Sequence, residues 1–330
     1  MKRRRKNIII AVIIVAVIAF ITIYIKFFNG SLIYISMGMG NNVVLKAKTQ
    51  QTSMMEADIL LSDARAEYEN VFGSDVWSQT IDGVSFEEYV KDQVKTKLIR
   101  VRCMNLYAKQ RGVVLSRTQK EAVSNAVTEY MSKLSDDQKN ALNITEEKLN
   151  TMFTDFAIAD ALFGDVTASV NKEISDDDAR VINVQYVAAS TEEDIKAAQA
   201  ELNSGVIFYV VASKYNDGGE YESELKRGET DENFEKAAFD LKNGEVSSIV
   251  EAEGKYYIIK CVSDNEKSKT EANKATLIEK NKLDYFNEQF ADFESSVYVE
   301  FNNRVWKNKQ VKNSTLLDVN FENIFDSVKE

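Results

Sequence analysis

The segment NFEKAAFDLKNGEVSSIV, residues 233–250 of a 330-residue chain, has the clearest structural pattern in the sequence. We expect a short helix over residues 233–241, because the turn Lys242-Asn243-Gly244 follows it directly. An apolar run at 246–250 then precedes a second one at 256–262, and Glu253-Gly254 between them predicts a closing hairpin. A helix followed by a hairpin indicates a mixed α+β unit.

Upstream of this segment, the hydrophobic period predicts one strand and two helices. From Val181 the period is two. Residues on one face of this strand would be Ile182, Val184 and Tyr186, and those on the other Asn183, Gln185 and Val187. Helices are expected over 191–203 and 208–215, followed by a turn at 216–219. The order is therefore strand, two helices, turn, helix and hairpin.

Amphipathic helices are predicted on both sides of this α+β unit. Ser53, Ser85 and Ser116 each precede a Glu or Gln by three residues, which is the capping-box spacing of a helix start, and a further helix is expected from Thr145. After the unit, one helix has an apolar stripe formed by Leu283, Phe286, Phe290 and Phe293. That stripe has no evident partner within the small unit, so we expect it to pack on the N-terminal helices.

Composition excludes several kinds of chemistry. The chain has no histidine and no proline, and only two cysteines. Ser-His-Asp and Cys-His catalysis, histidine metal sites and structural Cys-only zinc sites are therefore absent. Residues 31–330 have 35 basic and 52 acidic side chains, a formal charge of −17, which argues against a nucleic-acid partner. Cys103 and Cys261 fit buried free thiols better than a single disulfide, and no cofactor or metal is expected.

The N-terminus has the pattern of a membrane anchor. Five basic residues at positions 2–6 precede an uncharged run of 18 residues, 8–25, that contains nine isoleucines. Such a run is just long enough to span a bilayer, and the basic cluster favours a cytoplasmic N-terminus with the body outside. A cleaved signal peptide is the alternative, although no Ala-x-Ala pattern follows Phe20.

The α+β unit resembles the parvulin (PpiC, rotamase) family of peptidyl-prolyl cis-trans isomerases. The resemblance is carried in order by VQYVAAS, IKAAQAELNSGVIFYVVASKYND, GGEYESELKRGE, NFEKAAFDLKNGEVSSIV and GKYYIIKCV. The flanking segments DVWSQTIDGVSFEEYVKDQVKTKLI, RGVVLSRTQKEAV and ISDDDARV are similar to the helical chaperone region of extracytoplasmic foldases of the SurA and PrsA type. Those foldases also surround an inserted parvulin domain with helices.

Together with the anchor pattern, the resemblance implies an α+β fold with five parts. They are a basic tip and transmembrane anchor at 1–28, a linker at 29–44, a helical SurA_N-like chaperone domain at 45–178, the parvulin-like domain at 179–264, and C-terminal helices at 265–330 that pack back on the N-terminal domain.

The resemblance also implies site residues. Prolyl isomerisation is rotation about one C–N bond against a barrier of about 20 kcal/mol, so an apolar pocket and a hydrogen-bond network suffice. The two histidines of the parvulin network are replaced here by Gln185 and Tyr257, and Asp217 corresponds to the family's Cys or Asp. Tyr221, Thr230 and Phe234 correspond to substrate-binding positions.

Each of these residues also has a purely structural interpretation. Phe234 could pack the short helix on the sheet, and Asp217 suits any tight turn before Gly218-Gly219. Gln185 could be a solvent-facing strand residue, and Tyr257 has a high strand propensity.

The sequence thus predicts a membrane-anchored extracytoplasmic foldase that isomerises prolyl bonds and chaperones unfolded or nascent secreted polypeptides. The alternative is a non-catalytic holdase chaperone that keeps a degenerate parvulin domain for peptide binding, and an anchored scaffold for one partner is a third possibility. The histidine substitutions leave the strength of the enzymatic activity open.

Overall fold

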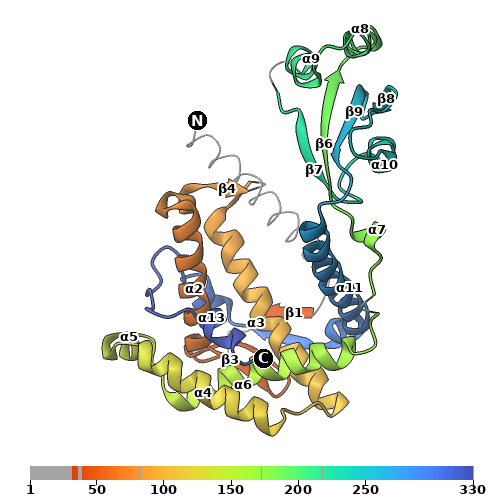
Figure 1. The fold of residues 1–330 in the computed structure, drawn as a ribbon. Helices are drawn as coiled ribbons and strands as arrows, with labels where there is room; N and C mark the ends of the chain where they lie inside the picture. Colours follow the sequence, from red (N-terminus) through yellow and green to blue (C-terminus); the bar gives the residue numbers. More distant parts are fainter. Residues whose placement is uncertain (1–31, 36–38, 82, 172, 217–218, 330) are drawn as a thin grey trace. The chain divides into compact units, whose positions relative to one another are not determined.

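The computed structural model describes residues 32–329 except 36–38, 82, 172 and 217–218. The chain divides into two compact units, one formed by residues 1–168 and 286–330 and the other by residues 169–285. The chain therefore leaves the first unit once and returns to it (Figure 1). The predicted anchor at 1–28 lies outside the described residues. Within the described ranges, no helix is both long enough and apolar enough to cross a membrane.

The second unit contains a four-stranded antiparallel sheet with three helices packed on it. The strand order is β7 (Glu222–Leu225), β6 (Ile182–Ala189), β9 (Lys255–Ser263) and β8 (Val250–Ala252). The helices are α8 (Glu192–Asn203), α9 (Phe208–Tyr215) and α10 (Glu232–Asp240), and the short helix α7 (Asp176–Ala179) precedes the first strand. The sequence predicted α8, α9 and α10 to within a few residues.

Local capping explains where two of these helices begin. The Thr191 side chain accepts a hydrogen bond from the backbone N–H of Asp194 at the start of α8. The Asp231 carboxylate accepts hydrogen bonds from the N–H groups of Asn233 and Phe234 at the start of α10. These bonds satisfy backbone donors that have no partner within the first helical turn.

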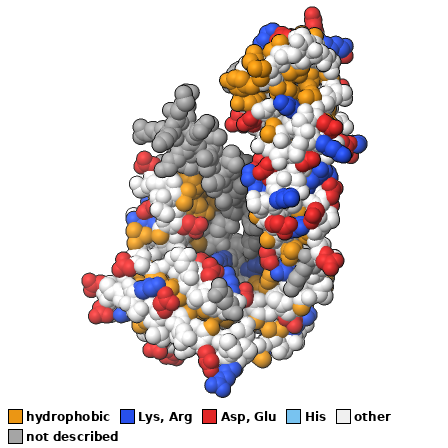
Figure 2. Space-filling view, viewed as in Figure 1, with side chains coloured by type: hydrophobic (Ala, Val, Ile, Leu, Met, Phe, Trp, Pro, Cys, Tyr) orange, Lys and Arg blue, Asp and Glu red, His pale blue; other side chains and the backbone are white. Residues whose placement is uncertain are grey.

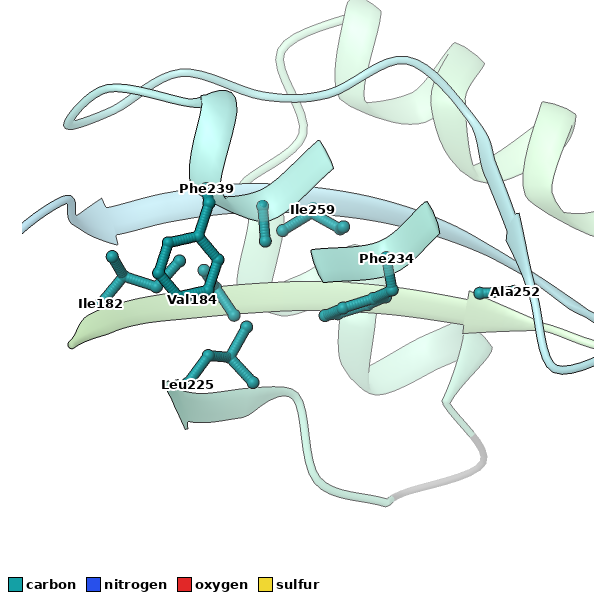
Figure 3. Packing of buried hydrophobic residues seen from close by; sticks show 8 residues of the cluster. Ile182, Val184, Leu225, Phe234, Phe239, Ala252 and Ile259 are labelled. Atoms are coloured by element: carbon teal, nitrogen blue, oxygen red, sulfur yellow. The ribbon is translucent and has the colours of Figure 1, made fainter. Parts of the chain in front are cut away.

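The two faces of the sheet are covered by different helices. Side chains alternate along β6, so Ile182 and Val184 pack against α10, whereas Val187 and Ala189 pack against α8 and α9. Figure 3 shows Phe234 and Phe239 lying over the strands beside Val184 and Ile259. The sheet is therefore buried on both sides. The alternating apolar residues of β6 provide one surface for α10 and the opposite surface for α8 and α9.

Two details of this unit differ from the prediction. Strand β7 was not predicted, because its sequence ESEL is mostly polar and, within the described residues, it pairs only with β6. The expected strand at 246–250 begins only at Val250, and Val246 forms a single isolated bridge to Lys260. Between them the Ser247 hydroxyl accepts a hydrogen bond from the backbone N–H of Ile259 at 2.9 Å, so a side chain interrupts the regular ladder.

The first unit is mainly helical. Its helices before the second unit are α2 (Met54–Phe72), the 3-10 helix η1 (Ser74–Ser78), α3 (Phe86–Arg111), α4 (Arg117–Lys133), α5 (Asp136–Ala141) and α6 (Glu146–Thr167). The predicted capping boxes at Ser53 and Ser116 are confirmed, and Ser85 caps α3 through the N–H of Glu88. A two-stranded ribbon, β4 (Thr80–Ile81) with β5 (Val84–Ser85), precedes α3.

The C-terminal residues complete this first unit. The long helix α11 (Lys267–Ser296) starts in the second unit, and its residues from Phe286 onward belong to the first. Strand β10 (Tyr298–Phe301) and the short helices α12 (Asn303–Trp306) and α13 (Phe321–Asp326) follow. The sequence predicted only helices for residues 265–330. The structure differs, because this segment contains strand β10, which is central in a sheet.

That sheet also corrects the interpretation of residues 29–44 as a linker. Its order is β1 (Leu32–Ile35), β10, β2 (Val43–Ala47) and β3 (Gln50–Ser53), with β1 parallel to β10. Strand β10 lies more than 250 residues from both of its neighbours in the chain, and local sequence cannot reveal such pairing. The expected connector therefore contains an edge strand.

The core of the first unit includes an ion network. Arg102 is 1% exposed, and its guanidinium bonds to Glu56, Asp155 and the Thr52 hydroxyl. This buried cation is fully partnered, as a charge in a low-dielectric interior requires. Cys103 and Cys261 are buried free thiols in different units, as the sequence predicted.

Candidate active site

A cavity of about 890 Å³ is lined by residues of β6, β9 and α10, with further residues from α8 and α9. Its apolar wall includes the aromatic side chains of Tyr186, Phe234 and Tyr257 and the alanines Ala188, Ala189 and Ala252, and Tyr215 and Leu225 also line the cavity. Strand β6, strand β9 and helix α10 each contribute one of the aromatic rings. A cavity of this size with a few polar groups along an apolar wall is typical of a small-ligand or peptide site.

The three rings contact one another edge to face. The centroid of the Phe234 ring lies 5.1 Å from that of Tyr257 and 6.1 Å from that of Tyr186, and the two tyrosine rings are 6.2 Å apart. Interplanar angles of 84°, 82° and 64° put ring edges against ring faces, which is the favourable aromatic arrangement. We call Tyr186, Phe234 and Tyr257 the aromatic trio.

The tyrosine hydroxyls of the trio are available to a ligand. Neither forms a hydrogen bond with a described residue of the chain. Burial raises the pKa of Tyr186, and the charge of Glu220 adds to this shift. Burial likewise raises the pKa of Tyr257, with further contributions from Glu253 and Asp231. Both hydroxyls therefore stay protonated at neutral pH and can donate hydrogen bonds.

Asn216 fixes the loop at the edge of this cavity. Its Nδ2 donates to the carbonyl oxygens of Tyr186 at 3.1 Å and Glu220 at 3.0 Å. Its Oδ1 accepts from the backbone N–H of Ala188 at 2.8 Å. One side chain thus joins the end of α9 to the part of β6 that carries Tyr186, which keeps the cavity wall in place.

Three of the six site residues singled out in the sequence line this cavity. They are Thr230, Phe234 and Tyr257. Phe234 is 7% exposed and belongs both to the hydrophobic core and to the cavity wall, so its two sequence interpretations are compatible.

The other three lie elsewhere or outside the described residues. Gln185 is on the opposite face of β6, where its Nε2 donates to Glu222 Oε1 at 2.7 Å. Tyr221 packs against the core beneath α8 and α9, with its ring 5.0 Å from that of Tyr209. Asp217 is not among the described residues.

Sequence reasoning missed Tyr186 and Asn216. The period-two pattern had already placed Tyr186 on the face shared by Ile182 and Val184, one residue from the chosen Gln185. Adjacent residues of a strand lie on opposite faces of the sheet. A site that contains Phe234 on the face of Ile182 and Val184 therefore includes Tyr186 and not Gln185. Asn216 had no signal beyond its place in an Asn-Asp-Gly-Gly turn.

The described surface of this unit also includes an apolar patch on α9. On α9 and the residue before it, Ile207, Tyr209 and Val210 are 70%, 52% and 49% exposed. Figure 2 shows apolar side chains gathered at the α8–α9 end of this unit among mixed charges. Among the described residues, no group of three or more Cys, Asp or Glu side chains is arranged to hold a metal ion.

Comparison with known proteins places this site in a family. Residues 182–263 match the rotamase family, the PPIC-type PPIASE domain. The foldase protein PrsA of Caldanaerobacter subterraneus is 22% identical over 67% of this chain and 74% of its own length. The PrsA foldase of Geobacillus kaustophilus is 31% identical over 44% of this chain and 55% of its own length.

A solved structure shows a weaker similarity. The crystal structure of the peptidylprolyl isomerase PrsA from Bacillus cereus aligns with 88% of this chain and all of that chain, at 19% identity and a TM-score of 0.38. The family match covers the strands and the helix that form the aromatic trio and its cavity. Residues 182–263 are therefore a rotamase domain of the PPIC (parvulin) type, and the chain that carries it is similar to PrsA foldases.

Proposed function

We propose that this chain is a membrane-anchored extracytoplasmic foldase that accelerates cis/trans isomerisation of prolyl bonds in unfolded secreted polypeptides. The observation that carries this proposal is the aromatic trio in an 890 Å³ cavity of a rotamase-family domain. An apolar wall suits a proline ring, and hydroxyl donors beside it can bind backbone carbonyls of the peptide other than that of the rotating amide. The proposed role of each side chain follows from these two requirements.

Isomerisation needs a site that favours the twisted amide over the planar one. Twisting removes amide resonance, so the carbonyl oxygen loses charge and the amide is less strongly solvated. An apolar cavity therefore favours the twisted form relative to water. We assign Phe234 to the ring pocket, with Thr230 at its edge, and Tyr186 and Tyr257 as hydrogen-bond donors to the peptide.

A holdase without catalysis is the second candidate. The exposed apolar residues Ile207, Tyr209 and Val210 favour it, since such patches bind apolar segments of unfolded chains. The absence of histidine from the whole chain favours it too. Client binding at α9 would not require any chemistry in the cavity.

One experiment separates the two candidates. The full-length chain, purified in mild detergent, is mixed with acetyl-Ala-Ala-Pro-Phe-amide, and NMR exchange spectroscopy measures the cis/trans rate. Suppression of aggregation of a reduced, unfolded secreted protein is followed in parallel. We expect rate acceleration that is lost in Phe234→Ala, because this side chain forms the proposed ring pocket.

A second variant keeps this test informative if Phe234→Ala fails to fold. Tyr257→Phe removes one hydroxyl from the cavity, and Tyr256→Phe removes one from the opposite face of the same strand. Only the former should slow isomerisation. Aggregation suppression without any acceleration by the native chain would contradict the enzymatic proposal and support the holdase.

The anchor is tested separately. We expect the chain to stay with cell membranes after an alkaline carbonate wash, because residues 8–25 contain no charge. An externally added protease should degrade the body in cells stripped of their wall. A soluble product in the culture medium that lacks residues 1–30 would show that the N-terminus is a cleaved signal instead.

A further inference from the structure

The polar part of the cavity lining is dominated by acidic residues. Five carboxylates line it, from Asp194, Glu220, Glu229, Asp231 and Glu253, against two amines. One of these amines, Lys214, is paired with Glu201, which is outside the lining. Lys255 supplies the other amine. The lining therefore has a formal excess of negative charge at neutral pH.

Some of these carboxylates are compensated locally and others are not. Asp231 caps α10, and Glu229 lies 3.8 Å from the Lys226 amine. Within the described part of the chain, Glu220 and Glu253 form no ion pair. Glu220 precedes β7, and Glu253 is in the β8–β9 turn. These two carboxylates are thus free to interact with a bound cation.

The charges lie close to the apolar wall where a peptide would bind. Glu220 contributes to the raised pKa of Tyr186, and Glu253 to that of Tyr257. The two uncompensated carboxylates therefore act on the hydroxyls of the aromatic trio from the positions that precede β7 and β9. A ligand bound against the aromatic trio would therefore lie close to one or both of the Glu220 and Glu253 carboxylates.

We propose that this cavity selects cationic polypeptide segments, binding those with Lys or Arg next to the ring-binding residue more tightly than neutral or acidic ones. This inference rests on the proposed function, because it assumes that the peptide occupies the cavity of the aromatic trio. Charge complementarity of this kind adds selectivity through repulsion of acidic segments as well as attraction of basic ones.

The test compares three peptides with the full-length chain. They are acetyl-Ala-X-Pro-Phe-amide with Lys, Gln or Glu at X, and NMR measures both the dissociation constant and the cis/trans exchange rate. We expect the Lys peptide to bind roughly threefold to tenfold more tightly than the Glu peptide at low salt, given the modest strength of exposed ion pairs. The difference should shrink in 0.5 M salt, where charges are screened.

Two double variants locate the selectivity. Glu220→Gln with Glu253→Gln should bring the three dissociation constants close together. Glu193→Gln with Glu251→Gln makes the same change in net charge at exposed positions outside the lining and should leave the ranking intact. Equal dissociation constants for the three peptides, or a ranking unchanged by the Glu220/Glu253 variant, would overturn the inference.

The two readouts keep this inference separate from the proposed function. Ranked binding without any acceleration of exchange would support the charge selectivity and contradict the enzymatic proposal. Acceleration of exchange together with equal dissociation constants for the three peptides would support the enzymatic proposal and contradict the charge selectivity. Absence of both binding and acceleration would overturn both.

Discussion

Tyr186 and Gln185 are neighbours in β6, yet their side chains lie on opposite faces of the sheet. Tyr186 contacts Phe234 and Tyr257 in the cavity, whereas Gln185 bonds to Glu222 of the adjacent strand. Successive side chains of a strand point to opposite faces of the sheet, so a shift of one residue decides whether a polar side chain can reach a ligand in the cavity. This makes the pair a direct test of where the site lies.

We predict that Tyr186→Phe lowers kcat/KM for isomerisation about fivefold, because a lost hydrogen bond contributes on the order of 1 kcal/mol. Gln185→Ala should leave kcat/KM unchanged, since its side chain is on the other face. Exchange NMR on the tetrapeptide provides both values. Equal losses in the two variants would show that the cavity is not the site of the reaction.

Asp63 is a buried carboxylic acid of the first unit. Its Oδ2 accepts a hydrogen bond from the backbone N–H of Phe321 at 2.8 Å, while its buried Oδ1 has no partner among the described residues. Burial raises the pKa of Asp63 to about 7, and Glu322 adds to the increase while Lys97 opposes it. The folded state therefore holds this proton more tightly than the unfolded state does.

The sign of the pH effect follows from this difference. Between about pH 4 and pH 7 the folded state keeps the Asp63 proton and the unfolded state loses it, so the contribution of Asp63 to stability falls as pH rises. We predict that the stability of Asp63→Asn relative to the native chain increases by on the order of 2–4 kcal/mol from pH 4 to pH 8. Urea unfolding, followed by tryptophan fluorescence at each pH, measures the free energy of unfolding of both proteins.

This readout is specific to the first unit, because Trp77 and Trp306 both belong to it. Asp137→Asn, at an exposed position, is the matched control and should show no such trend. A constant difference between Asp63→Asn and the native chain across this pH range would contradict the assignment.

At the scale of elements, helix α13 shows how a short segment is held by packing. It has six residues, Phe321–Asp326, too few for a stable isolated helix. Phe321 is fully buried, with its ring centroid 4.6 Å from that of Phe153 and 4.9 Å from that of Phe156 in α6. The helix therefore exists because its aromatic residues fill a site provided by distant parts of the chain.

We predict that Phe321→Ala destabilises the first unit by about 3–5 kcal/mol, the usual cost of removing a buried phenylalanine. The tryptophan-detected urea midpoint should fall accordingly. Phe239→Ala removes a ring of similar burial from the core of the second unit and should leave the tryptophan transition in place. Loss of that transition in Phe239→Ala would mean that the two units unfold together.

Helix α10 illustrates the opposite case, in which local signals are sufficient. Asp231 caps it, its apolar positions fall on one side, and the turn at 242–244 ends it. The sequence therefore predicted it to within one residue at each end. Strand β7 lacked such signals, since its polar residues form a strand only because the edge of β6 is beside them.

At the scale of the whole molecule, the chain has no proline at all. Prolyl isomerisation in an unfolded chain takes tens to hundreds of seconds, and it commonly produces slow refolding phases. We predict that refolding from urea has no phase whose amplitude grows with time spent unfolded. A double-jump experiment with tryptophan fluorescence measures this, and a slow phase that develops over tens of seconds after unfolding would contradict it.

The first unit is discontinuous in sequence, and this affects what could be predicted. Its sheet joins β1 and β2 to β10 across more than 250 residues, and β3 pairs with β2. The sequence predicted that the apolar stripe after residue 283 would return to the N-terminal helices, and Phe286 and Phe290 do contact Phe163 and Tyr107. It did not predict β1, β3 and β10, because pairing between distant segments leaves no periodic local pattern.

By itself, the sequence determined the α+β class, most helices with their caps, the rotamase domain and the absence of histidine chemistry, because these depend on local periodicity, motifs and composition. Only the tertiary structure decided which side chains share the cavity. It placed Tyr186 rather than Gln185 beside Phe234 and Tyr257, and gathered Glu220 and Glu253 around them. The physical reason is that strand register and the packing of α10 on the sheet bring together residues from distant segments.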